Sequence, residues 1–309
     1  MRYLIIGAGG TGGPIGAYLA LAGLDPVLIA RGAHLSAMQE NGLAVEPAWK
    51  DRYVCKVKAE NMESYEKAGY EKPDVIFVCV KGYSLETCIP FIRRIAKPET
   101  VVIPILNIYG TGRKLQSALP DLTVTDGCIY VSANIAAPGI LKMHGQIFRI
   151  VYGTPDHKTD DPRLLQVAKD LEKAGITPVY SSNIDKDAME KFSYVSAMAA
   201  CGLYYHAEAK EMQVPGEIRD FFAQLVDEIE ELAAAMGIHY EMHLREINLS
   251  ILDHLAPTAS TSMQRDIYAG HSSEIDGLIY EVVRLADHYK LSLPGYRKAA
   301  LKFQEEGLR

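Results

Sequence analysis

Near its start the chain reads Tyr3-Leu4-Ile5-Ile6-Gly7-Ala8-Gly9-Gly10-Thr11-Gly12, and this stretch decides the fold. Four apolar residues predict a buried strand, and the glycines match Gly-x-Gly-x-x-Gly just before an apolar helical stretch that runs to Ala22. In this context Gly7 permits a tight turn, Gly9 lets the backbone approach a pyrophosphate, and Gly12 lets the helix pack on the strand. The amides and dipole of the helix N-terminus favour an anion. We therefore predict that a dinucleotide binds at Gly7, Ala8, Gly9, Gly10, Thr11 and Gly12.

The alternative is a glycine-rich turn without a ligand, which the order of the following elements disfavours. Strands are predicted at 3–6, 26–30, 74–80 and 100–106, with crossover helices at 12–22, 33–41 and 85–96. Strands that alternate with helices predict a parallel sheet covered by helices. Between residues 122 and 153, strand-like runs broken by Pro138-Gly139 and Gly145 predict antiparallel hairpins appended to that sheet. One more helix and strand are predicted to end near Tyr180.

A change of periodicity at Ser181-Ser182-Asn183 predicts a domain boundary. We predict an α/β Rossmann domain over residues 1–182 and an all-α domain over residues 183–309. In the second domain an apolar stripe from Ile218 to Met236 predicts a helix that stops at Gly237. Another helix is predicted to begin after Ser273, with Asp276 as its capping-box partner.

Composition excludes several classes of protein. The formal net charge of -7 gives no basic surface for nucleic acid. No apolar run approaches the roughly 18 residues that cross a bilayer, and the N-terminus lacks the pattern of a signal peptide, so we expect a cytoplasmic protein without a membrane partner. Five scattered cysteines suggest neither disulfides nor zinc. His239 and His243 do not form His-Glu-x-x-His, so we predict an exposed helical pair and no metal.

Three polar residues follow predicted strands: Arg31, Lys81 and Asn107. Ligands of parallel sheets bind beyond the carboxyl ends of the strands, so all three are candidates for the cofactor crevice. Arg31 stands where a site for NAD usually has an acid, and its guanidinium suits a 2′-phosphate, so it predicts NADPH. Lys81 is a candidate to bind the cofactor phosphate, its ribose or a substrate anion. Asn107 is a candidate to form a hydrogen bond with the nicotinamide or the substrate. The alternative for each is a solvated strand end.

The order of these motifs resembles that of ketopantoate reductases over residues 3–295. The likeness rests on the glycine stretch, Arg31, Val80-Lys81, Leu106-Asn107, Pro138-Gly139, His144-Gly145, Glu190-Lys191-Phe192, Thr261-Ser262-Met263-Gln264-Arg265-Asp266 and Glu274-Ile275-Asp276. Its most specific parts are the lysine that opens the second domain and the last two blocks, which general dinucleotide-binding proteins lack.

The resemblance implies that NADPH reduces a 2-oxo acid to a 2-hydroxy acid, and that ketopantoate (2-dehydropantoate) becomes pantoate, a precursor of pantothenate. It implies that Lys191 is the general acid, that Glu274 contacts the substrate hydroxyl or the lysine, and that Ser262 contacts the substrate carboxylate. It also implies a homodimer through the helical domain. Without the resemblance, Lys191 would be interpreted as a solvated helix lysine. Glu274 would be interpreted as a carboxylate that the dipole favours in the first turn of a helix.

Two departures from the family pattern bear on the substrate. Val195 and Ala199 stand where the family usually presents asparagines one and two turns after the lysine, and Ser196 is a candidate to compensate in part. A pocket that loses polar groups discriminates differently, so a different branched 2-oxo acid is an alternative substrate.

A non-catalytic NADPH-binding protein is the alternative from another class. A short-chain dehydrogenase is excluded, because no tyrosine has a lysine four residues later.

Overall fold

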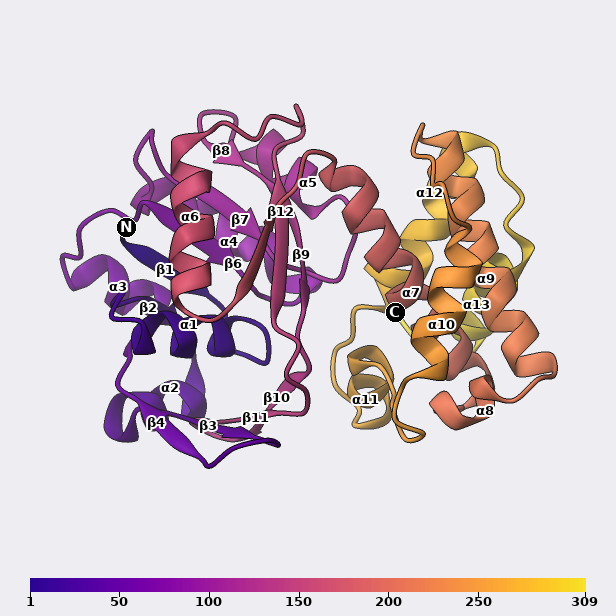
Figure 1. Ribbon diagram of the computed structural model, residues 1–309, viewed down its shortest axis with the longest axis horizontal. Helices are drawn as coiled ribbons and strands as arrows, with labels where there is room; N and C mark the ends of the chain where they lie inside the picture. Colours follow the sequence, from indigo (N-terminus) through magenta and orange to yellow (C-terminus); the bar gives the residue numbers. More distant parts are fainter. The chain divides into compact units, whose positions relative to one another are not determined.

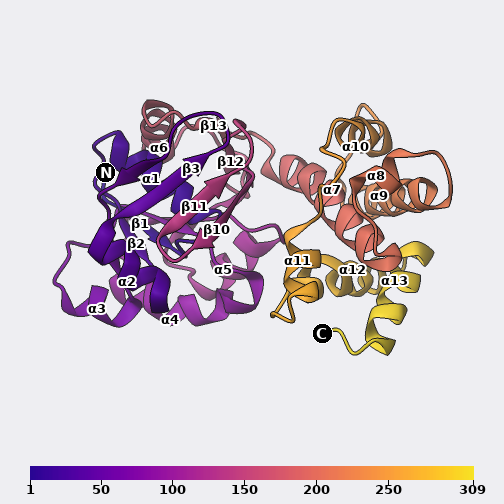
Figure 2. The same cartoon turned by 90° about the horizontal axis from the view of Figure 1, so that it is seen from below.

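The computed structural model describes all residues from Met1 to Arg309. Contacts divide the chain into two compact units (Figures 1 and 2). The first comprises Met1–Leu106 and Gly110–Ile184, and the second comprises Asn107–Tyr109 and Asp185–Arg309. The three residues 107–109 therefore pack with the C-terminal half of the chain, although their neighbours in sequence belong to the first unit.

A six-stranded parallel sheet forms the centre of the first unit, in the order β5-β2-β1-β6-β7-β8. Its strands are β1 (Tyr3–Ile6), β2 (Val27–Ile29), β5 (Lys58–Glu60), β6 (Val75–Val78), β7 (Val101–Pro104) and β8 (Thr123–Val124). All four predicted strands are present, and Ile5 pairs with Leu28 of β2 on one side and with Phe77 of β6 on the other. Chain order reverses at β1, which places a crevice at the carboxyl ends of β1 and β6, the usual ligand position in such sheets.

Helices cover both faces of this sheet because the residues of β1 alternate between two cores. Tyr3 and Ile5 pack into one core, with residues of α1, α2 and α6, whereas Leu4 and Ile6 pack into the other, with residues of α3, α4 and α5. The helices are α1 (Gly12–Leu21), α2 (Gly32–Asn41), α3 (Met62–Lys67), α4 (Leu85–Ile95), α5 (Thr111–Ala118) and α6 (Pro162–Lys173), and a 3₁₀ turn η1 (Gly82–Ser84) precedes α4. The predicted Rossmann-type α/β fold is confirmed.

Two smaller sheets accompany the main one. They are ordered β10-β11-β3-β4 and β13-β12-β9. Their strands are β3 (Leu43–Pro47), β4 (Tyr53–Cys55), β9 (Asp126–Tyr130), β10 (Ala133–Ala137), β11 (Ile140–Met143), β12 (Arg149–Gly153) and β13 (Thr177–Tyr180). The predicted hairpin at Pro138-Gly139 joins β10 to β11, and Figure 1 shows it with β3 and β4 at the lower end of the first unit. Both sheets are mixed, because β11 runs parallel to β3 and β12 runs parallel to β13, whereas the other pairs are antiparallel. The prediction that hairpins extend the main sheet is therefore wrong, since these strands form sheets of their own.

The second unit is helical after Ile184, as predicted. Its helices are α7 (Ile184–Tyr205), α8 (Ala209–Gln213), α9 (Glu217–Ala235), α10 (Leu244–Asp253), α11 (Ser262–Tyr268), α12 (Glu281–Tyr289) and α13 (Pro294–Glu305), and a π-helical turn η2 (Asp276–Tyr280) leads into α12. The stripe on α9 is buried as predicted, and Gly237 follows it with φ +81°. None of the helices is long and apolar enough to cross a membrane.

The predicted capping box at Ser273 is wrong. Asp276 lies inside the π-helical turn and pairs with the Arg284 guanidinium, at 2.8 Å from Nη1. The Ser273 hydroxyl accepts instead from the Ile275 amide at 3.4 Å. A capping box needs regular α-helical spacing between its two residues, and the wider π turn removes that spacing.

A buried carboxylate connects two helices of the second unit. Glu228 of α9 is 5% exposed and accepts hydrogen bonds from the backbone amides of Gly295 at 2.7 Å and Tyr296 at 2.9 Å. These amides belong to the first turn of α13, where no carbonyl of the same helix can accept them. Glu228 therefore caps α13 from a neighbouring helix, a contact between residues 67 positions apart.

We predict that Glu228→Ala lowers the free energy of unfolding by about 2 kcal/mol, because two buried amides lose a charged acceptor. Urea unfolding followed by circular dichroism measures this. Glu231→Ala, at an exposed position of the same helix, is the matched control and should change stability little. Equal stabilities of the two variants would contradict the capping role.

Candidate active site

The glycine-rich turn has the geometry that its sequence predicts at two of its glycines. Gly7 has φ +102°, and a Cβ there would lie 2.8 Å from the Cys79 carbonyl oxygen. A Cβ on Gly12 would collide with the Gly7 carbonyl oxygen and would lie 2.8 Å from the Ile5 side chain. A side chain at either position would force β1, α1 and β6 apart.

Gly9 differs from these two, because protein packing does not require a glycine there. No atom lies within 4 Å of the position of a Cβ, and its φ is outside the left-handed range. The bare Cα therefore faces open space at the point where the motif lets a backbone approach a pyrophosphate. This is the feature of the turn that a bound dinucleotide explains and packing does not.

The amides of the turn divide into two groups. Those of Gly7 and Ala8 donate to the Ile29 carbonyl of β2, at 3.1 and 3.2 Å. Those of Gly9, Gly10 and Thr11 take part in none of the backbone hydrogen bonds. The first turn of α1 also contains no acidic residue, so no carboxylate competes for the positive end of the helix dipole. The turn therefore fits the pyrophosphate of a dinucleotide.

The β10–β11 hairpin packs against this turn. A Cβ on Gly10 would collide with the Ala133 carbonyl of β10, and one on Gly13 would lie 2.6 Å from Leu141 Cδ1 of β11. His34 of α2 contacts both the turn and the hairpin. The sequence pattern carries no signal for these contacts, because the hairpin follows the turn by more than a hundred residues.

Arg31 and Lys81 lie at the carboxyl ends of the two strands that flank β1. Arg31 is exposed and is the N-cap residue of α2, with no capping hydrogen bond from its side chain. Lys81 is partly buried and precedes η1 after strand β6. Both positions agree with the sequence prediction that strand ends surround the glycine turn.

Lys191 and Asn107 are brought together, although 84 positions separate them. Lys191 Nζ donates a hydrogen bond to Asn107 Oδ1 at 2.8 Å, and both residues are part of the second unit. An ammonium has three protons to donate, and this bond uses one of them and orients the group.

The two residues after Asn107 hold this segment on the helical core. Ile108 fills the space above Gly277 in the π-helical turn, where any Cβ would collide with its side chain. The ring of Tyr109 packs beside Phe192, with 6.1 Å between the ring centroids. The side chains of Ile108 and Tyr109 are therefore both held by packing, and they fix the segment that begins at Asn107.

Ser196 is fully buried, and its hydrogen bonds lie within the helical unit. Its hydroxyl donates to the Leu278 carbonyl of the π-helical turn at 2.6 Å. Since that uses its one proton, the Tyr296 hydroxyl at 2.7 Å is the donor to Ser196 Oγ. Burial raises the pKa of Tyr296, which keeps this donor protonated. These partners give the fully buried Ser196 a structural role in place of the predicted substrate contact.

The remaining predicted positions differ in burial. Val195 is partly buried against the helical core, and Ala199 is fully buried. Glu274 is 4% exposed and accepts the Leu278 amide on its backbone carbonyl at 2.9 Å. Ser262 is the first residue of α11, behind a capping box formed by Thr261 and Gln264, and is partly exposed.

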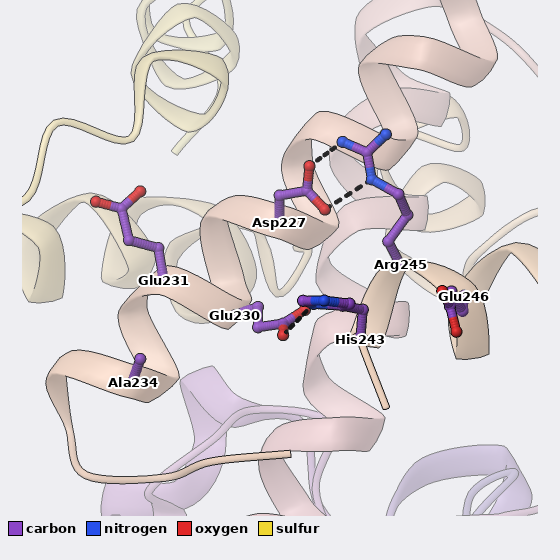
Figure 3. Close-up of a pocket in the computed structure, with 7 residues that line it drawn as sticks. All are labelled: Asp227, Glu230, Glu231, Ala234, His243, Arg245 and Glu246. Atoms are coloured by element: carbon purple, nitrogen blue, oxygen red, sulfur yellow. Dashed lines mark hydrogen bonds and ion pairs between the residues drawn. The ribbon is translucent and has the colours of Figure 1, made fainter. Parts of the chain in front are cut away.

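A hollow of about 510 Å³ on α9 and α10 is a different feature (Figure 3). Two pairs of its side chains contact each other: Asp227 with Arg245, and Glu230 with His243 Nδ1 at 3.0 Å. None of the predicted site residues lines it.

The prediction of a helical histidine pair is wrong, because His239 lies in the loop before α10 and His243 is the N-cap residue of that helix, although both are exposed as predicted.

The contrast between Gly9 and Gly12 predicts two different outcomes of the same substitution. Gly9→Ala should keep its melting temperature within about 2 °C of the parent, because the methyl group enters open space. It should nevertheless weaken NADPH binding by about tenfold or more, since the methyl group occupies the ligand's approach. Gly12→Ala should lose stability instead. Calorimetric scans and fluorescence titration test both, and unchanged NADPH affinity in Gly9→Ala would contradict the assignment of the turn.

Comparisons with known proteins agree with this geometry. Residues 3–157 match the family model described as Ketopantoate reductase PanE/ApbA, and residues 183–299 match the model of its C-terminal part. A 2-dehydropantoate 2-reductase of Pyrococcus abyssi is 28% identical to this chain and covers 95% of it, with 94% of its own length matched.

Solved structures show the same fold. The 2-dehydropantoate 2-reductase of Methylococcus capsulatus superposes with a TM-score of 0.88 at 22% identity, over 100% of this chain and 97% of that one. A D-mandelate dehydrogenase solved with NADH and anilino(oxo)acetate gives a TM-score of 0.86 at 21% identity, over 97% and 96% of the two chains. Since the two family models together match most of the chain, this protein belongs to the ketopantoate reductase PanE/ApbA family of oxidoreductases.

Proposed function

We propose that the protein uses NADPH to reduce a 2-oxo acid to a 2-hydroxy acid, with 2-dehydropantoate as first candidate substrate and pantoate, a precursor of pantothenate, as product. The observation that carries the proposal is the 2.8 Å hydrogen bond between Lys191 Nζ and Asn107 Oδ1. It orients an ammonium, which can act as the proton donor that a ketone reduction needs. The family resemblance also supports a homodimer.

The cofactor half of the proposal rests on the glycine turn and on Arg31. Gly9, Gly10 and Thr11 offer amides to the pyrophosphate, and Arg31 offers an exposed guanidinium that suits the 2′-phosphate of NADPH. An acid in place of Arg31 would repel that phosphate and would favour NADH. Lys81 supplies a second cation near the same strand ends.

The chemistry assigned to the chain is proton donation. NADPH, when bound, would supply the hydride for the ketone carbon of the substrate. Lys191 holds the carbonyl oxygen by a hydrogen bond and gives it a proton from Nζ as negative charge develops there, which leaves a hydroxyl and a neutral amine. Asn107 orients the ammonium through its side-chain oxygen. Ser262 is assigned to the substrate carboxylate, and Glu274 to the substrate hydroxyl or the lysine.

The substrate side chain is the open part of the proposal. Val195 and Ala199 follow Lys191 at spacings of four and eight residues, so they share its face of α7. Neither side chain can donate a hydrogen bond to a substrate hydroxyl. This favours 2-oxo acids with an apolar branched side chain as alternative substrates to 2-dehydropantoate. A D-mandelate dehydrogenase of the same fold was solved with anilino(oxo)acetate, so aryl 2-oxo acids belong among the test substrates.

The reaction is tested by following NADPH absorbance with 2-dehydropantoate and a panel of branched and aryl 2-oxo acids. Lys191→Ala should lower kcat by about a hundredfold or more, with NADPH affinity little changed, because it removes a proton donor and no cofactor ligand. Lys186→Ala is the matched control on the same helix, since Lys186 pairs with Glu241. If the parent binds NADPH and turns over none of these acids, the protein is a non-catalytic NADPH-binding protein.

Cofactor preference is tested separately with Arg31→Ala. Loss of charged hydrogen bonds to the 2′-phosphate should weaken NADPH binding by about 10-fold to 100-fold and leave NADH binding nearly unchanged. Arg52→Ala, which removes an exposed arginine paired with Glu46, controls for loss of net charge. Retention of the parent's preference for NADPH in Arg31→Ala would assign the phosphate to another residue.

A further inference from the structure

His34 links two parts of the candidate dinucleotide site to the β10–β11 hairpin. It lies in the first turn of α2, three residues after Arg31, and is half-buried. Its Nε2 atom is 3.0 Å from the Ala8 carbonyl oxygen in the glycine turn. Its Nδ1 atom is 3.0 Å from the Gly139 amide nitrogen in the hairpin.

These two contacts fix the protonation of the ring. A backbone amide only donates, so Nδ1 must accept the Gly139 N–H, and the proton of the neutral ring is on Nε2. Nε2 then donates to the Ala8 carbonyl, and both ring nitrogens are satisfied. Burial lowers the pKa of His34, although the bond to Ala8 opposes that shift. The neutral ring is thus the form that both partners require.

The groups that His34 joins are themselves held in place. The amide of Ala8 donates to the Ile29 carbonyl of β2. Gly139 has φ +74°, and a Cβ there would lie 2.9 Å from the Ala37 Cβ of α2. The Gly139 carbonyl accepts the Ala44 amide of β3 at 2.9 Å. His34 therefore connects a fixed turn to a fixed hairpin through the first turn of the helix that begins after Arg31.

We propose that His34 is a positioning residue for NADPH: it holds the glycine turn and Arg31 at the separation that the pyrophosphate and the 2′-phosphate of one cofactor molecule require. The inference rests on the proposed function, because it assigns these two groups to two phosphates of the same ligand. A ligand that spans two preformed sites binds more tightly when no ordering of those sites is needed at the moment of binding. His34 itself does not touch the cofactor in this arrangement.

Three substitutions separate the two bonds of the ring. In His34→Gln the side-chain amide nitrogen reaches the position of Nε2 and can donate to Ala8. In His34→Asn the amide oxygen reaches the position of Nδ1 and can accept from Gly139. His34→Ala removes both bonds. Ser36→Ala, an exposed change on the same helix, is the matched control.

NADPH and NADH affinities are measured by fluorescence titration, and KM and kcat with a 2-oxo acid that the parent reduces, at a temperature where calorimetry shows every variant folded. His34→Ala should raise the NADPH Kd and KM by about tenfold and should narrow the preference for NADPH over NADH, with kcat unchanged. His34→Gln should recover most of the NADPH affinity, and His34→Asn much less. Of the two hydrogen bonds of the ring, only the one to Ala8 joins the glycine turn to α2.

The outcomes distinguish this inference from the proposed function. If the parent binds no NADPH, the proposed function fails, and the role of His34 fails with it. If the parent binds NADPH and the folded variants bind it equally well, only the role of His34 is overturned. A lower melting temperature with unchanged Kd and cofactor preference would also overturn it, since a purely structural histidine gives that result. So would equal affinities of the Gln and Asn variants, since the proposal requires the Ala8 bond to carry the effect.

Discussion

The close packing of α1 on β1 is the constraint on which the rest of the first unit depends. It exists because Gly12 has no side chain at the point where the Gly7 carbonyl approaches. The same close approach leaves the amides of Gly9, Gly10 and Thr11 without backbone partners. Local packing and anion binding are thus two results of one glycine pattern, and this is why so short a stretch predicts both the fold and a ligand.

In the second unit a comparable role belongs to the π-helical turn η2. The turn places Gly277 beneath Ile108 and places the Leu278 carbonyl where Ser196 of α7 can donate to it. The segment that carries Asn107 and the helix that carries Lys191 are therefore both attached to the same irregular turn. π-Helical turns are rare and occur frequently at functional sites, and here the turn supports the pair assigned to proton donation.

The sequence predicted those parts of the structure that depend on local pattern. The apolar runs at β1, β2, β6 and β7 and the stripe on α9 identify their elements because burial imposes a period on neighbouring residues. Strands β3, β4 and β5 were not predicted; β4 and β5 each bury only one of their three residues, so neither gives the continuous apolar run that identifies β2. The capping box at Ser273 failed because a π turn has no signature of its own in sequence.

For the candidate site, the pattern supplied the strand-end residues and the family likeness supplied Lys191. Neither supplied His34 or the role of Ser196. Their partners Gly139 and Leu278 lie 105 and 82 positions away, and a single sequence carries no information on such pairs. The assigned roles of Ser262 and Glu274 still rest on the family resemblance, together with their positions at the starts of helical segments.

The membership of residues 107–109 in the second unit has a consequence for how this protein can be recombined with its relatives. A chimera made by one crossover at the boundary near residue 183 would take Lys191 and the π-helical turn from one parent, and Asn107, Ile108 and Tyr109 from the other. The bulky Ile108 would then meet whatever residue the second parent has in place of Gly277. Two separate segments, residues 107–109 and 185–309, must be exchanged together to transfer the helical unit intact, so the chain's two halves are less modular than their separation in sequence suggests.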